Sequence, residues 1–383
     1  MKKIFIFSIL ILSSFLHLHA GRSLLTKDAQ ISLLTCDPGT ELYSTFGHSA
    51  LRVKDTAYHI DRVYNYGTFD FNTPNFYMKF ARGKLKYQLS VSGYKNFMAE
   101  YVWENRSVYE QVLNLTRTEK DTLFYLLEQN YLPENRYYLY DFFKDNCSTR
   151  IRDIVEKALN NRVKFDTSVP HPDLSFRDLI NPYLINMPWS KLGIDIALGL
   201  PADDAATPDE YMFLPLGLME RFKTAHVAPD NHPLALQAHT LYKAYPVSTE
   251  SPLSPAIACW SLLFIALLIT FFSWKKRNIV AIIFDKILFI LAGLTGILVV
   301  FLWFFSDHSA TQYNLNLLWA NPLYFFFLFR SKFSRGLSWF VTGILAFVII
   351  AFPFLPQDLN NNLIPVILTL ILRIYGGILR KYN

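Results

Sequence analysis

Residues 145–159 read DNCSTRIRDIVEKAL and predict an amphipathic helix that opens with a cysteine. Cys147 stands in the first turn, where backbone N–H groups and the helix dipole lower the pKa of a thiol. Arg150 and Arg152 follow closely enough in the sequence to add positive charge. The position therefore suits a thiolate nucleophile, and a buried, inert cysteine is the alternative. The apolar residues that define the helix face recur at helical spacing: Ile151, Ile154, Val155, Ala158 and Leu159.

A thiolate nucleophile needs a base, and the best candidate is His48 in the segment FGHSA at residues 46–50. We expect His48 to open a strand in a hairpin formed by residues 49–53 and 58–66. A third polar group should orient the imidazole, and the sequence leaves His59 and Asp61 on the partner strand as open options. Backbone N–H groups at the start of the cysteine helix, or the side chain of Asn146, are expected to hold an oxyanion.

The region around these residues, 21–250, mixes strand and helix signals and predicts an α+β domain. Residues 108–115 are typical of a strand, and the segment TRTE at 116–119 resembles a capping box that begins a helix. Residues 160–250 are rich in Pro, Asn and Asp, so we expect an irregular subdomain and a linker that ends near residues 246–255.

The N-terminus predicts export of this domain. Lys2 and Lys3 precede the apolar stretch 4–16, and Ala20 is a small residue at a suitable cleavage point. We interpret residues 1–20 as a secretory signal peptide. An uncleaved anchor is the alternative, and either version exports the segment that follows.

The composition indicates that the rest of the chain lies in a membrane. Charged residues make up 18% of the chain and hydrophobic residues 52%, whereas soluble domains carry about a quarter charged residues. The apolar excess lies in residues 256–380, where we expect a membrane domain of about five helices. The expected spans are 256–274, 280–305, 316–329, 336–354 and 363–379.

Positive charge alternates along this membrane half. Lys and Arg cluster at 275–277, 330–335 and 380–381, whereas the loops 306–314 and 356–362 contain neither. The positive-inside rule places the basic ends in the cytoplasm and residues 21–250 outside. We therefore interpret the net charge of +6 as membrane topology and expect no nucleic-acid partner.

Several polar residues interrupt the apolar half. Asp285, Lys286 and Arg373 lie nearer the expected cytoplasmic ends, where snorkelling or a pair of Asp285 with its neighbour Lys286 explains them. The outer loop at 307–316, which contains His308, is polar without being basic. It either completes a site at the membrane surface or is a solvated loop.

The other cysteines and histidines predict no metal site and no cofactor. No Cys/His cluster has metal-ligand spacing, and no glycine-rich loop has the pattern of a phosphate site. Cys36 has three interpretations: a second nucleophile, a disulfide partner for Cys147, or a buried small residue. We favour the last, because a disulfide would abolish the thiolate.

Three longer motifs surround the candidate residues: LTCDPGTELYSTFGHSALR at 34–52, YNYGTFDF at 64–71 and DFFKDNCSTR at 141–150. Together they resemble the Lnb family of bacterial lipoprotein N-acyltransferases. The resemblance implies a permuted NlpC/P60 fold, papain-like and similar to lecithin:retinol acyltransferase, followed by an α-helical transmembrane bundle. His48 precedes Cys147 in the chain, as the permuted order requires, and His59 approximates the further His common in such relatives.

The resemblance also implies an activity. The chain would move an acyl chain from a phospholipid, through a thioester on Cys147, to the α-amine of a diacylglyceryl-cysteine lipoprotein at the outer face of the bacterial inner membrane. Two alternatives remain. A periplasmic Cys/His hydrolase of peptidoglycan or lipid would use the same residues, whereas a non-enzymatic membrane sensor or assembly factor would not need them. Aromatic residues either line a lipid-facing groove or pack a core: Tyr64, Tyr66, Phe69, Phe71, Phe76, Tyr77 and Phe80.

Overall fold

The computed structural model describes residues 24–168, 173–246, 253–275, 278–329 and 331–379. The expected signal peptide lies outside the described residues. So do several of the basic residues of the membrane half: Lys276, Arg277, Arg330, Arg380 and Lys381.

A seven-stranded antiparallel sheet forms the N-terminal domain, in the order β10-β5-β1-β2-β3-β4-β6. The expected hairpin is confirmed as β2 and β3, and the expected strand at 108–115 is confirmed as the shorter β5. The bounds are β1 Gln30–Cys36, β2 His48–Asp55, β3 Ile60–Thr68, β4 Lys86–Gly93, β5 Val108–Val112, β6 Tyr137–Leu139 and β10 His239–Tyr242.

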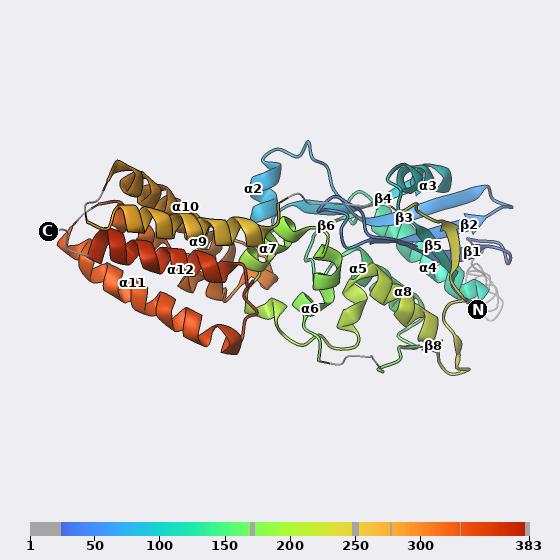
Figure 1. Ribbon diagram of the computed structural model, residues 1–383. Coiled ribbons are helices and arrows are strands. Elements are labelled where there is room, and N and C mark those ends of the chain that lie inside the picture. Colours follow the sequence, from blue (N-terminus) through green and yellow to red (C-terminus); the bar gives the residue numbers. More distant parts are fainter. Residues whose placement is uncertain (1–23, 169–172, 247–252, 276–277, 330, 380–383) are drawn as a thin grey trace, which may run out of the picture.

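Helices cover both faces of this sheet, because successive strand residues point to opposite sides. Leu51 and Tyr64 pack with residues of α4 (Arg117–Tyr131), α5 (Cys147–Ala158) and α8 (Pro215–Thr224). Their neighbours Ala50 and Val63 pack instead against α3 (Tyr94–Trp103) on the other face. Figure 1 shows α3 above the sheet and α5 and α8 below it. The predicted capping box at Thr116 and Glu119 is present at the start of α4.

Residues 160–250 are more regular than the sequence predicted. Besides α8 and β10 they form α6 (Phe176–Ile180) and α7 (Pro188–Ala197), with a small sheet of β7 (Val163–Lys164), β8 (His226–Val227) and β9 (His232–Pro233). Short 3₁₀ turns connect them: η1 Asn181–Leu184, η2 Leu200–Ala202 and η3 Glu210–Phe213. Helices α6 and α7 lie between the sheet domain and the C-terminal helices (Figure 1). The 3₁₀ turns and α6 are too short to leave a periodic pattern, and α7 and α8 are ten residues each and begin at a proline within a Pro- and Asp-rich region, which explains the missed helices.

Apolar helices make up the C-terminal region: α9 Pro255–Phe272, α10 Ile279–Phe304, α11 Lys332–Ala351 and α12 Leu363–Ile374. In the described residues, three helical stretches are long and apolar enough to cross a membrane, and Leu363–Leu379 is a shorter apolar one. The expected span 316–329 differs, because it forms two 3₁₀ segments, η5 (Leu315–Leu318) and η6 (Pro322–Leu328). Pro322 lacks an N–H, and the Asn321 side chain accepts from the N–H of Leu323, so an α-helix cannot continue through this point.

The outer loops of the helical region contact the N-terminal half. The N–H of Asp307 donates to the carbonyl of Arg82 (3.0 Å), and the Gln357 amide donates to the carbonyl of Leu198 (2.9 Å). Because the chain reverses between successive segments, the ends that carry Lys275 and Lys332 lie at the opposite side, away from the sheet (Figure 1). This arrangement agrees with the alternation of basic loops in the sequence.

Asp285 pairs with Arg373 and not with its neighbour Lys286. The Arg373 guanidinium donates to Asp285 (2.6 Å) and to the Thr270 hydroxyl (2.6 Å), and both charged side chains are buried. Lys286 is exposed. The neighbour-pair explanation is therefore wrong: an ion pair between α10 and α12 removes the cost of two charges in an apolar bundle.

Candidate active site

Cys147 is the first residue of α5, held there by the cap at Asn146. The Asn146 side-chain oxygen accepts from the N–H groups of Ser148 (2.8 Å) and Thr149 (3.0 Å). Its amide group donates to the carbonyls of Phe142 (2.7 Å) and Phe213 (2.9 Å). These four bonds occupy the side chain, so the expectation that Asn146 holds an oxyanion is not supported. Its structural task is to fix the start of the helix.

The Cys147 thiol is buried and interacts with His48 and with the backbone N–H of Ser49, both on β2. The Ser148 hydroxyl of α5 lies 3.9 Å from the sulfur and 3.0 Å from the Ser49 hydroxyl, which joins the start of α5 to the start of β2. Burial by itself raises the pKa of the thiol. The imidazole, by charge and by hydrogen bond, outweighs this effect together with the N–H of Ser49 and the Ser148 hydroxyl, so the pKa of Cys147 lies below its ordinary value.

His48 is the first residue of β2 and bridges the thiol and Asn65. Its Nε2 lies 2.5 Å from Oδ1 of Asn65 on β3. Because a carbonyl oxygen only accepts, Nε2 carries a proton and Nδ1 is left to exchange one with the thiol. Burial opposes the charged ring, but the charge and hydrogen bond of Cys147 and then the bond to Asn65 outweigh it, so the pKa of His48 is raised.

The sequence did not identify Asn65, and its two expected orienters lie elsewhere. His59 stands in the turn between β2 and β3, with φ of 57°. Asp61 is opposite Lys54 in the register and forms an ion pair with Arg52 (2.8 Å). Six residues separate Lys54 from His48 along β2, which is about 20 Å in a strand. The proposed roles of His59 and Asp61 are corrected on this ground. Counting the antiparallel register back from the turn would have pointed to the YNYG segment.

Arg150 and Arg152 do not face the thiol as the sequence suggested. Arg150 pairs with Asp145 (2.6 Å) and covers the ring of Tyr138 at 3.5 Å, and Arg152 pairs with its neighbour Asp153 (2.7 Å). The low pKa of Cys147 therefore depends on His48 and, to a smaller extent, on the N–H of Ser49 and the Ser148 hydroxyl.

Aromatic side chains and one glycine surround the thiol. Gly67 has φ of +85°, and a Cβ built there would lie 3.6 Å from Cβ of Cys147 and 3.6 Å from the ring of Tyr140. Burial raises the pKa of Tyr66 and of Tyr87 to about 12 in each case, so both rings stay neutral at physiological pH. Cys147 is thus closely surrounded by largely apolar groups and is only 7% exposed.

Cys36 and Cys147 are both free and buried. Cys36 stands opposite His48 on β1, and burial raises the pKa of its thiol. A thiol that is harder to ionise is a poor nucleophile. The structure therefore agrees with the interpretation of Cys36 as a buried small residue and not with a disulfide.

The loop with His308 contacts the segment before Cys147, but His308 itself bonds elsewhere. Its Nε2 lies 2.7 Å from the carbonyl of Phe80. The next residue, Ser309, donates from its hydroxyl to Asp141 (2.7 Å), six positions before the cysteine. The structure thus brings the loop beside the approach to α5 without placing the imidazole against the thiol.

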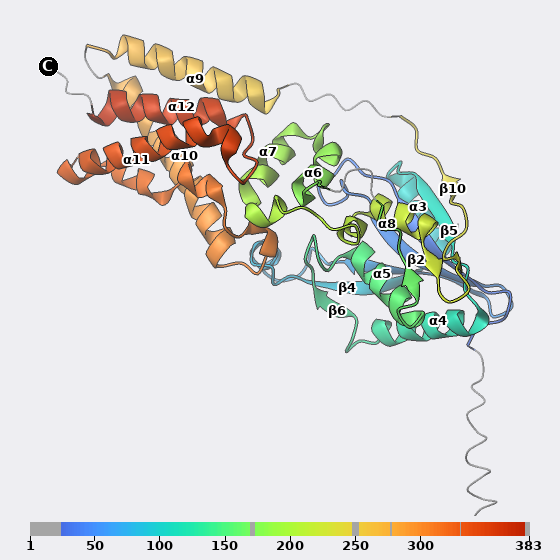
Figure 2. The ribbon, with the colours of Figure 1, turned by 90° about the horizontal axis from the view of Figure 1, so that it is seen from below.

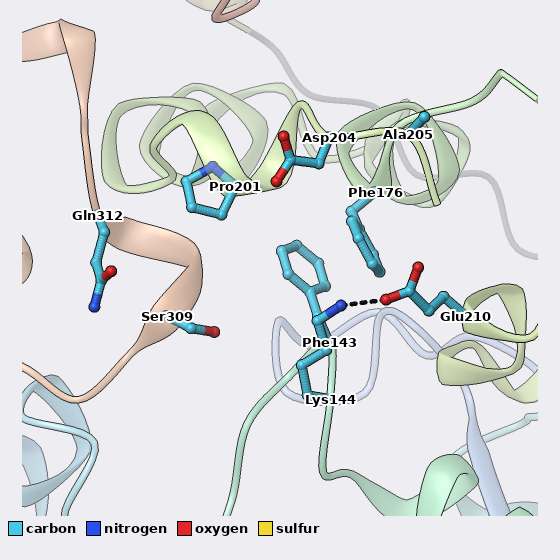
Figure 3. A pocket seen from close by; sticks show the side chains of 9 residues that line it. All are labelled: Phe143, Lys144, Phe176, Pro201, Asp204, Ala205, Glu210, Ser309 and Gln312. Carbon is cyan, nitrogen blue, oxygen red and sulfur yellow. Dashed lines mark hydrogen bonds and ion pairs between the residues drawn. The ribbon is translucent and has the colours of Figure 1, made fainter. Parts of the chain in front are cut away.

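A cavity of about 370 Å³ opens between this loop and the irregular subdomain (Figure 3). An ion pair of Lys144 and Glu210 closes one side. None of the three residues His48, Asn65 and Cys147 lines it. The lining residues are Phe143, Lys144, Phe176, Pro201, Asp204, Ala205, Glu210, Ser309 and Gln312. Within the described ranges, no group of three or more His, Cys, Asp or Glu side chains has the arrangement of a metal site.

Two family models match this chain. The Lnb N-terminal periplasmic domain covers residues 19–181, and the Lnb transmembrane domain covers residues 247–383. No curated protein and no solved structure matches, so the permuted papain-like topology stays a prediction. The matches agree with a membrane protein whose N-terminal sheet domain lies in the periplasm. The chain belongs to the Lnb family.

Proposed function

We propose that this protein is a lipoprotein N-acyltransferase of the bacterial inner membrane. The observation that carries the proposal is the buried thiol of Cys147, whose pKa is lowered by His48, an imidazole that is itself held by Asn65. This is the nucleophile, base and orienting group that a thioester mechanism requires. Membership of the Lnb family fits a role in lipoprotein processing.

The first half-reaction makes the thioester. His48 takes the thiol proton, and the sulfur of Cys147 attacks the ester carbonyl of a phospholipid. As the tetrahedral intermediate collapses, the ester C–O bond breaks and the imidazolium returns its proton to the leaving oxygen. A lysophospholipid departs, and the acyl chain stays on the sulfur.

The second half-reaction moves the acyl chain to the lipoprotein. The free α-amine of the diacylglyceryl-cysteine attacks the thioester, His48 accepts a proton from the amine nitrogen, and the C–S bond breaks. The products are an amide and the regenerated thiol–imidazole pair. Both substrates are lipids of the outer leaflet, which gives a reason for joining this domain to a membrane bundle.

The oxyanion of each step is held by backbone N–H groups. The Asn146 side chain already occupies the N–H groups of Ser148 and Thr149. The N–H of Cys147 itself has no acceptor within the helix, because it belongs to the first turn. We assign it the oxyanion, together with the N–H of Ser49 once an acyl group replaces the thiolate charge.

The experiment is the intact mass of the purified protein in detergent with added phospholipid. We expect an added mass of one acyl chain that hydroxylamine removes, present in the wild type and absent in Cys147→Ala. Addition of a diacylated lipopeptide should discharge the adduct and yield an N-acylated peptide.

Two other results would contradict the proposal. Discharge to free fatty acid, with no peptide product, would favour a lipid hydrolase. Absence of any adduct on folded protein would favour a peptidase or a non-enzymatic sensor, and the second of these requires that Cys147→Ala keep its function in cells.

A further inference from the structure

A short segment of the sheet domain exposes an unusual number of large apolar side chains. Helix α2 (Phe76–Ala81) has no buried residue. The exposed fractions are 61% for Phe71, 80% for Tyr77, 56% for Met78 and 50% for Phe80. We call residues 69–82 the α2 segment. An apolar surface of this kind marks a contact with a partner or a membrane.

The α2 segment is bonded to the outer end of α10. The carbonyl of Phe80 lies 2.7 Å from Nε2 of His308, and the carbonyl of Arg82 accepts the N–H of Asp307 (3.0 Å). Lys84 forms an ion pair with Asp307. Figures 1 and 2 both show α2 beside the ends of the C-terminal helices that face the sheet domain.

That end of α10 carries an aromatic belt. Trp303 stacks on Phe304 with ring centroids 4.8 Å apart, and Tyr313 lies 5.7 Å from Trp303. Phe304 and Phe305 are 62% and 64% exposed. Such belts lie at the level of the lipid headgroups. Because Asp307 and His308 follow directly, the α2 segment lies at the same level.

A row of aromatic rings leads from the α2 segment to the thiol. Phe69 contacts both Phe71 (5.0 Å) and Tyr87 (5.2 Å), and Tyr87 stacks on Tyr140 at 4.4 Å. Tyr140 and Cys147 flank Gly67, where an added Cβ would lie 3.6 Å from the Tyr140 ring and 3.6 Å from Cβ of Cys147. The rings of this row are thus continuous from the membrane side of the domain to the sulfur.

We propose that the α2 segment lies in the outer-leaflet interface and that the phospholipid ester reaches Cys147 along the row Phe69, Tyr87 and Tyr140. The inference rests on the proposed function for the identity of the lipid as acyl donor, but not for contact with the bilayer. Exposed Arg82 and Lys86 add positive charge that favours anionic headgroups. Of the seven aromatics considered in the sequence, two are buried in the core (Tyr64 and Tyr66), two pack partly against it (Phe69 and Phe76), and three are exposed (Phe71, Tyr77 and Phe80).

The first test measures depth in a bilayer without using activity. A spin label at Tyr77→Cys, in the Cys147→Ala protein in phospholipid nanodiscs, should collide more with oxygen than with a water-soluble nickel chelate. The matched control is Trp103→Cys at the end of α3, which is 85% exposed and is expected to favour the chelate. Unsubstituted Cys147→Ala protein reports labelling of the two remaining cysteines. Equal chelate accessibility at positions 77 and 103 would overturn the inference.

The second test compares two acyl donors. The triple variant Phe71→Ser, Tyr77→Ser, Phe80→Ser should lose at least tenfold in the rate of thioester formation from vesicle phospholipid relative to its rate with a water-soluble butyryl ester. The control Trp103→Ser should leave both rates at the wild-type level. An equal fall with both donors would contradict the inference and indicate a general loss of structure.

The two failures are distinguishable. If the wild type forms no adduct with either donor, the proposed acyltransferase chemistry fails while the depth measurement still decides the membrane contact. If the wild type forms the adduct but position 77 is in water, the lipid path fails alone. If a lipopeptide, and not the bilayer, shields the spin label at position 77 from the nickel chelate, the surface binds the acceptor and the inference is overturned.

Discussion

Two buried polar clusters of this chain serve opposite purposes: one joins two parts of the chain rigidly, and the other holds a proton that can move. At the junction between α6 and α7, Arg177 donates to Asp203 (2.8 Å) and to Asp195 (3.0 Å), and all three side chains are buried. Asp195 also accepts from Asn360 of the membrane region (2.7 Å). At the Cys147 site the group that orients the imidazole, the amide of Asn65, carries no charge.

The difference is one of satisfied charge. In the junction cluster the Arg177 guanidinium faces two carboxylates, so it holds its proton and joins two parts of the chain. In the Cys147 site the sulfur and the ring nitrogen share one proton, and Asn65 fixes the ring without adding a charge that would hold the proton in place. Full pairing gives rigidity, and incomplete pairing gives a proton that can move.

The largest expected effect breaks the mobile pair. His48→Ala removes the base and the main stabiliser of the thiolate, so thioester formation should fall by about a thousandfold or more. Intact mass against time measures the rate. His59→Ala, at the far end of the same hairpin, is the control and should stay within about twofold of the wild type. A similar loss in both variants would mean that the hairpin, not the pair, had been damaged.

The next effect breaks the rigid cluster. Arg177→Met removes the cation that faces Asp203 and one of the two that face Asp195, where Lys191 remains, and this costs on the order of 3–5 kcal/mol of stability. In detergent at pH 7, thermal unfolding should fall by at least about 6 °C. Arg152→Met, which breaks a pair with the largely exposed Asp153, should cost less than about 1 kcal/mol. Equal midpoints for the two variants would show that the junction contributes no more than a surface pair.

A smaller effect is expected for Asn65→Ala, which keeps Cys147 and His48 but removes the side chain that orients the imidazole. The pKa of Cys147 is lowered and that of His48 is raised, and both shifts favour the thiolate–imidazolium form over the neutral pair. This form is lost at low pH, where the thiolate is protonated, and at high pH, where the imidazolium loses its proton. Asn65→Ala removes a hydrogen bond that raises the pKa of His48, so the alkaline limb should move to lower pH. We expect a rate about 10- to 100-fold lower at the optimum. The pH dependence of the rate of thioester formation measures the alkaline limb, and an unmoved limb would leave Asn65 without an orienting role.

The smallest expected effect concerns the contact between the two regions. His308→Ala removes the bond to the carbonyl of Phe80 and loosens the α2 segment, so activity with vesicle phospholipid should fall several-fold without a change in thermal unfolding. The assay is adduct formation from vesicles. Wild-type turnover in this variant would remove the loop from the mechanism.

The pattern of neighbouring residues alone predicted much of this architecture. The cap and apolar face of α5, the β2–β3 hairpin, the α4 capping box and the apolar spans all depend on residues within a few positions of one another. The motifs around His48 and Cys147 carried the family resemblance. Pro322 stands inside the span expected at 316–329, where the apolar composition predicts one helix and the missing N–H of the proline ends it.

Tertiary structure decided the rest, because it depends on segments far apart in the chain. The register of β2 and β3 brings Asn65, and not His59 or Asp61, beside His48. A shift of one residue along a strand displaces a side chain by about 3.3 Å. The packing of α12 against α10 makes Arg373, and not Lys286, the partner of Asp285. The contacts between the loop after α10 and the carbonyls of Phe80 and Arg82 place the exposed rings of α2 beside the membrane helices, and these contacts join segments far apart in the chain. The amino-acid sequence by itself determined which groups this protein has for chemistry and where its membrane half begins. The tertiary structure alone decided which of those groups meet, because antiparallel register and helix packing set distances that spacing along the chain does not contain.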